Sequence, residues 1–439
     1  MTGRKLLFII IVSMSVLIGL SFRFYGYLPT WKLWNIPATL PPFTDLRLLP
    51  GSAESFRQGF DPVKQNPGDP LGRHFNYPRA WYLVFYTGIK QSDTIWLGIL
   101  LALGFLFSAW MFPRRLDLTS AGFLALILFS PASMLALERG NVDLFIFILC
   151  ALALLTLENR VWLSAGFFML ATLLKLFPIF AFVAFLQRGK KHFFIISIAA
   201  SAILLIYAAL TYSNIVASYA FTEKGGDLSY GVTVLPLYLH PFLAAPNIYG
   251  IFILGSYFAA FGLFGSAVFY GIRSKLLPVA DVHHLAAFRL GAAIYVGTFF
   301  LGNNWDYRLI FLLFTIPQLV SWGAASRAAR WILAMLILSC WYLITLKIFG
   351  GLPFGHELVY AVDQICKWGL FAGLIHLFFR VRPWFAEVNE IRRAVSEDAD
   401  TLTRIAVADA VGFYEKMGMR QTGERIYRGW LLPLLQKKL

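Results

Sequence analysis

Residues 161–192 read VWLSAGFFMLATLLKLFPIFAFVAFLQRGKKH, an apolar run that contains one lysine and one proline and ends in a basic cluster. Lys and Arg concentrate in the cytosolic loops of membrane proteins. If 161–187 were a single crossing, this cluster and those at 273–275, 327–330 and 380–382 would face outward. A break near Lys175, before Pro178, places all of them on the cytosolic side.

Each half of the broken run would be about 18–20 Å long at 1.5 Å per residue, too short to cross the hydrocarbon layer. Such short helices are tolerated only where they line a protein or water cavity. An ammonium group at membrane depth costs at least about 2.5–3.5 kcal/mol, so Lys175 needs a partner. The stretch therefore predicts a helical hairpin that faces a polar cavity.

The composition agrees with a membrane protein. Hydrophobic residues make up 59% of the 439 and charged residues 14%, with a mean hydropathy of +0.67. The net charge of +15 is dispersed between apolar spans, which favours contact with anionic lipid head groups and excludes nucleic acid as the expected partner. The three cysteines, Cys150, Cys340 and Cys366, lie in apolar spans and are interpreted as small hydrophobic residues.

Apolar length predicts an all-α, polytopic bundle of about twelve hydrophobic helices. The expected helices are 5–22, 94–112, 120–137, 142–157, the two halves of 161–187, 193–212, 250–271, 285–301, 308–323, 331–348 and 358–379, and a short apolar stretch, 80–90, precedes the second of them. The first is interpreted as a retained signal anchor in the plasma or inner membrane, because no small-residue cleavage site follows it.

The charge pattern also divides the chain. We expect a membrane domain over 1–380 and a small tail over 381–439, with both termini cytosolic. The non-cytosolic face then carries two long loops, 23–79 and 213–249, and the short segments 138–143, 302–308 and 349–357. His283 and His284 are expected in a solvated cytosolic loop.

The first outer loop is the most informative segment for chemistry. Asp45 follows the first span closely enough to lie at the membrane interface, where a partly desolvated carboxylate can act as a general base. Alternatively, Thr44 or Asp45 is the N-cap of a short interfacial helix that runs to Arg57.

Several short motifs accompany Asp45 along the chain. They are Ser52-Ala53, Gly59-Phe60-Asp61-Pro62, Phe75-Asn76-Tyr77-Pro78, Gly140-Asn141-Val142-Asp143 and Lys175-Leu176-Phe177-Pro178. With them the sequence resembles the GT-C superfamily of integral membrane glycosyltransferases, and within it the polyprenol-phosphate-mannose-dependent mannosyltransferases. The resemblance covers roughly residues 1–320. It departs from that branch at Arg79, where a second proline is common. Some GT-C branches also carry paired acids in this loop, whereas Asp45 stands alone, so a divalent metal is compatible with the sequence but not indicated, and no other cofactor is expected.

The resemblance implies a specific reaction. A sugar would pass from a polyprenyl-phosphate donor to a lipid or glycan acceptor on the non-cytosolic face, with inversion and with Asp45 as the base. The phosphate that leaves needs fixed cations or hydrogen-bond donors. The candidates for this are Arg139, Lys175 and Arg308, with His74 and His240 as further ones. The other candidate substrate-binding residues are Asp61, Tyr77, Asn141, Asp143, Asn304 and Asp306.

Plain structural roles would also explain several of these residues. Arg139 can form an ion pair with the adjacent Glu138 at a helix end, and Asp143 is a suitable first-turn acid. In GNNWDYR (302–308), Asp306 and Arg308 can neutralise each other. The loop 213–249 can cover a prenyl chain without binding a specific ligand.

The tail differs from the rest of the chain. Val388, Ile391 and Val395 show helical spacing, and 410–419 (AVGFYEKMGM) is weakly similar to an element near the end of GNAT acetyltransferases. The rest of such a domain is absent, so an interaction or vestigial role is expected.

Two other functions are compatible with the sequence. A carrier or flippase of lipid-linked saccharides could use the same basic cavity without a base. A polysaccharide polymerase or ligase of the cell envelope would use a diphosphate-linked donor, with its key residues in 213–249.

Overall fold

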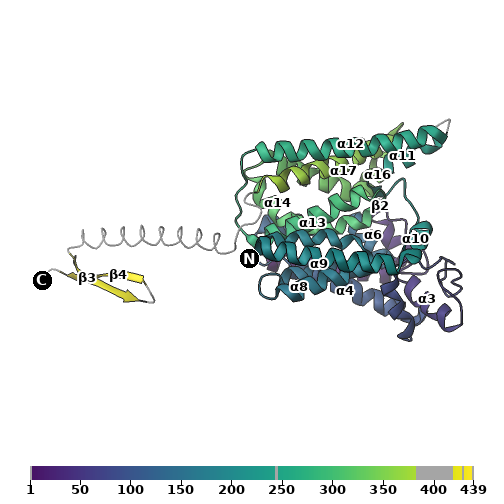
Figure 1. The fold of residues 1–439 in the computed structure, drawn as a ribbon, viewed down its shortest axis with the longest axis horizontal. Coiled ribbons are helices and arrows are strands. Elements are labelled where there is room, and N and C mark those ends of the chain that lie inside the picture. Colours follow the sequence, from purple (N-terminus) through teal and green to yellow (C-terminus); the bar gives the residue numbers. More distant parts are fainter. Residues whose placement is uncertain (1, 243–245, 382–418, 428–429, 438–439) are drawn as a thin grey trace.

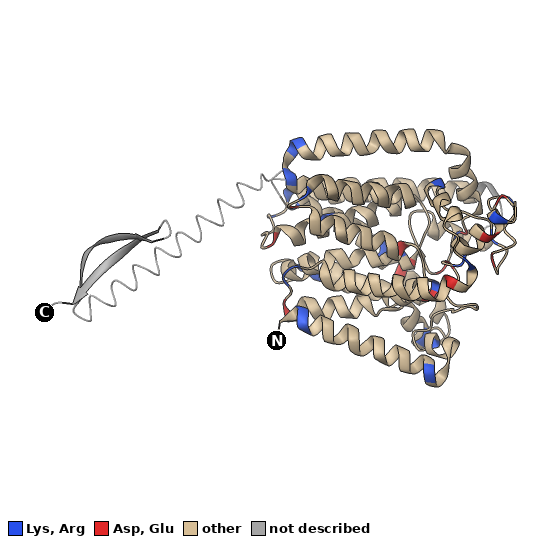
Figure 2. Ribbon diagram, turned by 90° about the horizontal axis from the view of Figure 1, so that it is seen from below, with Lys and Arg blue, Asp and Glu red and all other residues tan. Residues whose placement is uncertain are grey.

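The computed structural model describes residues 2–242, 246–381, 419–427 and 430–437, and most of them are helical. The long helices lie side by side with roughly parallel axes (Figure 1). Charged residues lie at both ends of the bundle, and a small mixed group lies inside it (Figure 2). The predicted class, an all-α membrane bundle, is confirmed.

The first half of the chain supplies the helices α1 to α10. They are α1 (Gly3–Tyr25), α2 (Tyr27–Lys32), α3 (Leu48–Arg57), η1 (Arg79–Tyr86), η2 (Gln91–Asp93), α4 (Thr94–Met111), α5 (Leu118–Leu128), α6 (Pro131–Arg139), α7 (Asp143–Thr156), α8 (Val161–Lys175), η3 (Phe177–Arg188), α9 (Gly189–Leu210) and α10 (Tyr212–Phe221), where η marks a 3-10 helix.

The second half supplies the remaining elements of the bundle. They are β1 (Ser229–Tyr230), α11 (Val234–Leu239), η4 (His240–Phe242), α12 (Pro246–Arg273), α13 (Val282–Phe300), β2 (Asn304–Trp305), η5 (Asp306–Thr315), α14 (Ile316–Gly323), α15 (Arg327–Cys340), α16 (Tyr342–Phe349) and α17 (Gly355–Phe379).

Fewer segments could cross a membrane than the sequence predicts. Among the described residues, five are long and apolar enough, and seven if each bent helix pair counts as one span. The five are Gly3–Tyr25, Gln91–Met111, Phe177–Leu210, Ile248–Arg273 and Gly355–Phe379. The expected count of about twelve hydrophobic helices is higher, because α8 is short, as predicted, α7 is also short, and two further expected spans are bent pairs.

The hairpin predicted for 161–187 is present. Helix α8 ends at Lys175, and Leu176 adopts φ 59° and ψ −50°, outside the helical region. The next segment, η3, begins at Phe177 and packs back against α8. Pro178 has no N–H to donate, so a continuous α-helix through this point would lose a hydrogen bond. The break near Lys175 is therefore confirmed.

Other expected straight spans are bent. The span 120–137 is divided into α5 and α6, which meet at 52° just before Pro131, and 331–348 into α15 and α16, which meet at 66°. The span 308–323 is divided into η5 and α14. Hydropathy registers apolar length but not direction, so these bends were not predicted.

His283 and His284, which were expected in a solvated cytosolic loop, belong to a helix instead. His283 and His284 lie buried in the first turn of α13, and Asp281 accepts hydrogen bonds from both of their backbone N–H groups. The Nε2 atom of His283 lies 2.6 Å from the carbonyl oxygen of Phe112. The prediction of solvated histidines was wrong, because α13 begins at Val282, three residues before the expected start at 285, and includes both histidines.

A short strand pair connects the second outer loop to 302–308. Strands β1 and β2 are antiparallel, with Ser229 opposite Trp305 and Tyr230 opposite Asn304. Helices α3 and α10 and strand β2 gather at the end of the bundle away from the N-terminus (Figure 1). The candidate residues of three separate loops therefore converge at that end.

The C-terminal part contains strands β3 (Met419–Tyr427) and β4 (Trp430–Lys437), which pair antiparallel. The sequence did not predict this strand pair. The helical pattern at 388–395 and the acetyltransferase-like element up to Gly418 lie outside the described residues.

Candidate active site

A cavity of about 460 Å³ collects most of the candidate residues. Its lining comes from the first outer loop, the turn between α6 and α7, the end of α8, the segment after α10, and the 303–308 segment. The lining residues are Pro37, Asp45, Leu48, Leu71, Arg73, Asn76, Tyr77, Leu135, Arg139, Asn141, Lys175, Phe221, Thr222, Glu223, Leu228, Asn303, Asn304, Trp305, Tyr307 and Arg308.

Asp45 lies in this lining with its side chain 21% exposed. Its Oδ1 is 3.3 Å from Nη1 of Arg73, and its Oδ2 accepts a hydrogen bond of 2.7 Å from Nδ2 of Asn141. A carboxylate oxygen has two lone pairs, so each keeps one for a further donor. The N-cap alternative was wrong: α3 begins at Leu48, its N-cap is Arg47, and no side chain caps it.

The turn between α6 and α7 connects Asp45 to the rest of the site. Asn141 donates to Asp45, while its Oδ1 accepts a 2.9 Å hydrogen bond from the backbone N–H of Asp143. Gly140 has φ 57°, and a Cβ there would lie 3.0 Å from Cβ of Phe43. Only glycine fits this backbone conformation and this close approach without strain.

Asp143 binds two cations from different parts of the chain. Its fully buried carboxylate lies 3.4 Å from Nζ of Lys175 and accepts a 3.0 Å hydrogen bond from Nε of Arg308. Nη1 of Arg308 donates to Oδ1 of Asn304. The partner that Lys175 was expected to need is therefore Asp143, and the first-turn position predicted for Asp143 is also present.

These two cations keep donor groups free. No described residue accepts from Nη2 of Arg308, and the described contacts of the Lys175 ammonium are Asp143 and the Tyr77 ring, whose centroid is 4.8 Å away. Both residues line the cavity. Their remaining N–H groups can therefore donate to an anionic ligand.

Arg139 also lines the cavity, but protein groups engage its donors. Its Nε is 3.2 Å from the buried Glu138 carboxylate, Nη1 donates to Oγ1 of Thr39, and Nη2 donates to the carbonyl oxygen of Pro37. The ion-pair alternative is thus present. Arg139 therefore binds the 37–39 segment to the end of α6. It has fewer free N–H groups for a ligand than Lys175 or Arg308.

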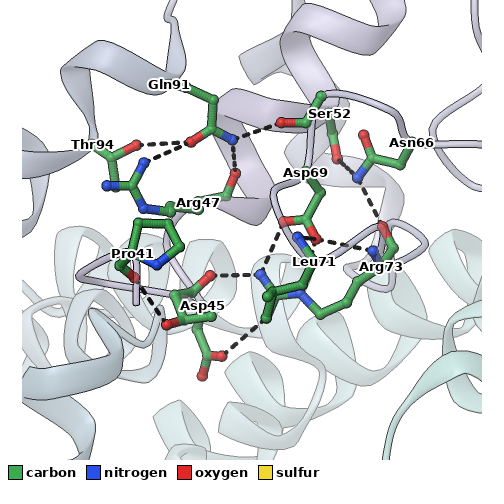
Figure 3. A network of polar contacts seen from close by, with 12 residues as sticks. Pro41, Asp45, Arg47, Ser52, Asn66, Asp69, Leu71, Arg73, Gln91 and Thr94 are labelled. Atoms are coloured by element: carbon green, nitrogen blue, oxygen red, sulfur yellow. Dashed lines mark hydrogen bonds and ion pairs between the residues drawn. The ribbon is translucent and has the colours of Figure 1, made fainter. Parts of the chain in front are cut away.

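Asp69 and Arg73 were not among the residues predicted from the sequence. The Arg73 guanidinium binds the Asp69 carboxylate through two hydrogen bonds, Nε to Oδ2 at 3.1 Å and Nη2 to Oδ1 at 3.0 Å, and also contacts Asp45 (Figure 3). Burial alone would lower the pKa of Arg73, but the hydrogen bonds and charge of Asp69, together with the charge of Asp45, raise it. Both residues lie in a loop without helical or strand spacing, so no pattern in the sequence indicated them.

Aromatic and amide groups complete the wall. Tyr77, Phe221, Trp305 and Tyr307 line the cavity beside Asn303. Burial, and next the charge of Asp45, raises the pKa of Tyr77 well above its ordinary value, so it stays a neutral phenol. Aromatic faces next to amides and a carboxylate offer both stacking and hydrogen bonds to a polar ligand with apolar faces.

Besides Asp143, which lies behind Lys175 and Arg308, four predicted site residues are not part of the lining. Asp61 and His240 are exposed, and His74 stacks on Phe221 with ring centroids 4.2 Å apart. Asp306 is buried and pairs with Lys367 at 2.8 Å. The alternative that Asp306 and Arg308 neutralise each other was wrong, because each has a different partner. Among the described residues, no group of three His, Cys, Asp or Glu is placed to hold a metal ion.

Comparisons with known proteins give one family match and one structural match. The family model of glycosyltransferase family 87 matches residues 76–301, which include Tyr77, the α6–α7 turn and Lys175. The chain has a TM-score of 0.35 and 13% sequence identity to the crystal structure of ArnT from Cupriavidus metallidurans in the apo state, over 85% of this chain and 76% of that one. No curated protein matches significantly.

Proposed function

The chain belongs to glycosyltransferase family 87, and from this premise we propose that it transfers a hexose from a polyprenyl-phosphate donor to a lipid or glycan acceptor. We further propose that the sugar is mannose, that configuration inverts, and that the site faces the non-cytosolic side. The GT-C type of mechanism expected from the sequence fits a cavity at one end of a helical bundle. The observation that carries the proposal is the arrangement around the α6–α7 turn.

This turn sets the base and the phosphate-binding cations at a fixed relative position. Asn141 binds the Asp45 carboxylate, and Asp143, two residues later, binds Lys175 and Arg308. A transfer with inversion needs a base on one side of the sugar carbon and a stabilised leaving group on the other. One rigid turn provides both, and Gly140 permits its conformation.

The proposed reaction is a single displacement. The acceptor hydroxyl oxygen attacks C1 of the sugar while its proton passes to the Asp45 carboxylate. The bond between C1 and the phosphate oxygen breaks, and its electron pair leaves with the polyprenyl phosphate. The free donor groups of Lys175 and Arg308 stabilise the negative charge that develops on this phosphate.

A donor panel tests the proposed function. Purified protein in lipid nanodiscs would receive labelled polyprenyl-phosphate-mannose, polyprenyl-diphosphate-linked sugar or GDP-mannose, together with a lipid extract. We expect transfer from the monophosphate-linked donor alone. Transfer from the diphosphate-linked donor would favour a polymerase or ligase, and transfer from GDP-mannose would contradict the proposal.

Replacement of Lys175 by methionine tests the phosphate site. A hydrogen bond to a charged group contributes about 1.5–3 kcal/mol, so we expect the KM for the donor to rise about 10- to 100-fold. Arg308 still neutralises Asp143 in this variant, so the protein should remain folded. Steady-state kinetics at varied donor concentration measure the change.

The control for this experiment is Lys175→Arg, which keeps the charge and should retain most of the donor affinity. An unchanged donor KM in Lys175→Met, with unchanged thermal stability, would contradict the assignment of Lys175 to the phosphate.

A further inference from the structure

We propose that Asp69 and Arg73 form a positioning pair that fixes the Asp45 carboxylate in its reactive orientation. The inference rests on the proposed role of Asp45 as the base. Asp69 lies outside the cavity lining, and Arg73 is part of it. The pair lies entirely within the loop that connects α3 to η1.

Arg73 is held in place independently of Asp45. Two of its nitrogens bind the Asp69 carboxylate, whose side chain is fully buried, and Nη2 also donates to the carbonyl oxygen of Thr44 at 2.6 Å. Oδ2 of Asp69 further accepts from the backbone N–H groups of Leu71 and Arg73. Asp69 therefore serves the loop and Arg73 rather than a ligand.

The loop that carries the pair is itself fixed to α3. The buried Asn66 side chain donates to Oγ of Ser52 and to the carbonyl oxygen of Arg73, and its Oδ1 accepts from Oγ of Ser55 (Figure 3). Where the loop crosses α3, a Cβ on Gly51 would lie 2.6 Å from the carbonyl oxygen of Gly68. This close contact leaves the loop little freedom to shift.

Asp45 is thus held at both oxygens by donors from different segments. Arg73 lies at Oδ1 and Asn141 at Oδ2, which together fix the plane of the carboxylate. An arginine next to a base would also weaken it, because a positive charge disfavours protonation. The charge of Asp69 offsets that of Arg73, so Asp45, Arg73 and Asp69 together keep one net negative charge. The pair therefore orients Asp45 without adding a net positive charge beside it.

The variants that test this inference are Asp69→Asn, Arg73→Lys and Arg73→Gln. We expect Asp69→Asn to lower kcat about tenfold and Arg73→Gln about 30- to 100-fold, because a displacement of about 1 Å can cost about a factor of 100 in rate. Arg73→Lys should restore part of the loss. The KM for polyprenyl-phosphate-mannose should stay within about threefold, because the phosphate is bound elsewhere.

Arg47 provides a matched control. It lies in the same polar network, donates to the carbonyl oxygen of Pro42 and to Gln91, and does not line the cavity (Figure 3). Arg47→Gln should lower the thermal stability as much as Arg73→Gln does but change kcat less than about twofold. An equal fall of kcat in both variants would show a purely structural role.

Two further outcomes separate the inference from the proposed function. If Arg73→Gln raises the donor KM more than tenfold at unchanged kcat, Arg73 binds the phosphate and the inference is wrong. If Asp45→Asn inactivates the protein while Asp69→Asn and Arg73→Gln keep the wild-type kcat, only the inference fails. If Asp45→Asn retains full transfer, the proposed role of Asp45 as the base is wrong, and the inference fails with it. If Arg73→Gln does not fold, the kcat of the nearly isosteric variant Asp69→Asn tests the inference instead.

Discussion

Replacement of Asp45 by asparagine is expected to lower the rate of sugar transfer by about two to four orders of magnitude, the range for loss of a general base. The donor KM should change less than about threefold, because Lys175 and Arg308 keep Asp143 as their partner. An amide has the shape of the carboxylate but cannot take the acceptor proton. Labelled polyprenyl-phosphate-mannose and a lipid extract measure the rate.

The substitution also has a local structural cost. Both Arg73 and Asn141 donate to Asp45, so the NH₂ of an asparagine would face a donor on one side. We expect a loss of about 1–3 kcal/mol in stability from the unsatisfied group. Thermal unfolding of the same preparation separates this loss from the loss of the base. A preparation that is folded, binds donor and transfers nothing is the expected result.

The control for the Asp45 experiment is Asp93→Asn, since Asp93 caps η2 and does not line the cavity. It should keep transfer within about twofold of wild type. Equal transfer by wild type and Asp45→Asn would rule out Asp45 as the base. Wild type that moves a lipid-linked saccharide across vesicles without transfer would instead favour the carrier alternative.

The sequence predicted those parts of the site that follow from local rules. An ammonium group in an apolar run must have a partner, and Lys175 has Asp143. A proline after Lys175 predicted the break that brings this lysine to the cavity. The turn at 140–143 was identified by its motif, but the sequence did not indicate that its two polar side chains connect opposite halves of the site.

Long-range pairing could not be predicted. Asp306 and Arg308 are neighbours in the sequence, yet Asp306 pairs with Lys367 on α17 and Arg308 with Asp143 on α7. Both residues lie at the start of the 3-10 helix η5, and their side chains point to different helices. The spacing of residues in the sequence does not show which helix each side chain contacts. Arg73 was missed for a similar reason, because its loop has neither apolar alternation nor helical spacing to indicate which side chains face inward.

A second buried charge cluster fixes the 302–308 segment. The fully buried Lys367 ammonium lies 2.8 Å from Asp306 and 2.6 Å from Asp363, and it donates to the carbonyl oxygen of Ser229 at 3.0 Å. It thereby holds β1 and the start of η5 against α17. Asn304 and Arg308, which flank Asp306, depend on this contact for their position in the cavity.

Replacement of Lys367 by methionine is therefore expected to destabilise the protein by about 3–5 kcal/mol, the loss typical of one partner of a buried ion pair. Two buried carboxylates would lose their countercharge, while the apolar part of the side chain is retained. Thermal unfolding in detergent, followed by tryptophan fluorescence and size-exclusion profile, measures the loss. The donor KM should rise as well, since Arg308 loses its support.

Two variants distinguish the loss of charge from the loss of packing. The exposed Lys347 on α16 has one described contact, a 3.3 Å hydrogen bond to the carbonyl oxygen of Lys32, so Lys347→Met should cost less than about 1 kcal/mol. Adding Asp306→Asn and Asp363→Asn to Lys367→Met removes the uncompensated charges, and replacing buried ions by neutral groups is often nearly neutral. The triple variant should therefore recover most of the stability. If it is as unstable as Lys367→Met alone, the hydrogen bond to Ser229 and the packing of the ammonium stabilise this end of the bundle, rather than the balance of charge.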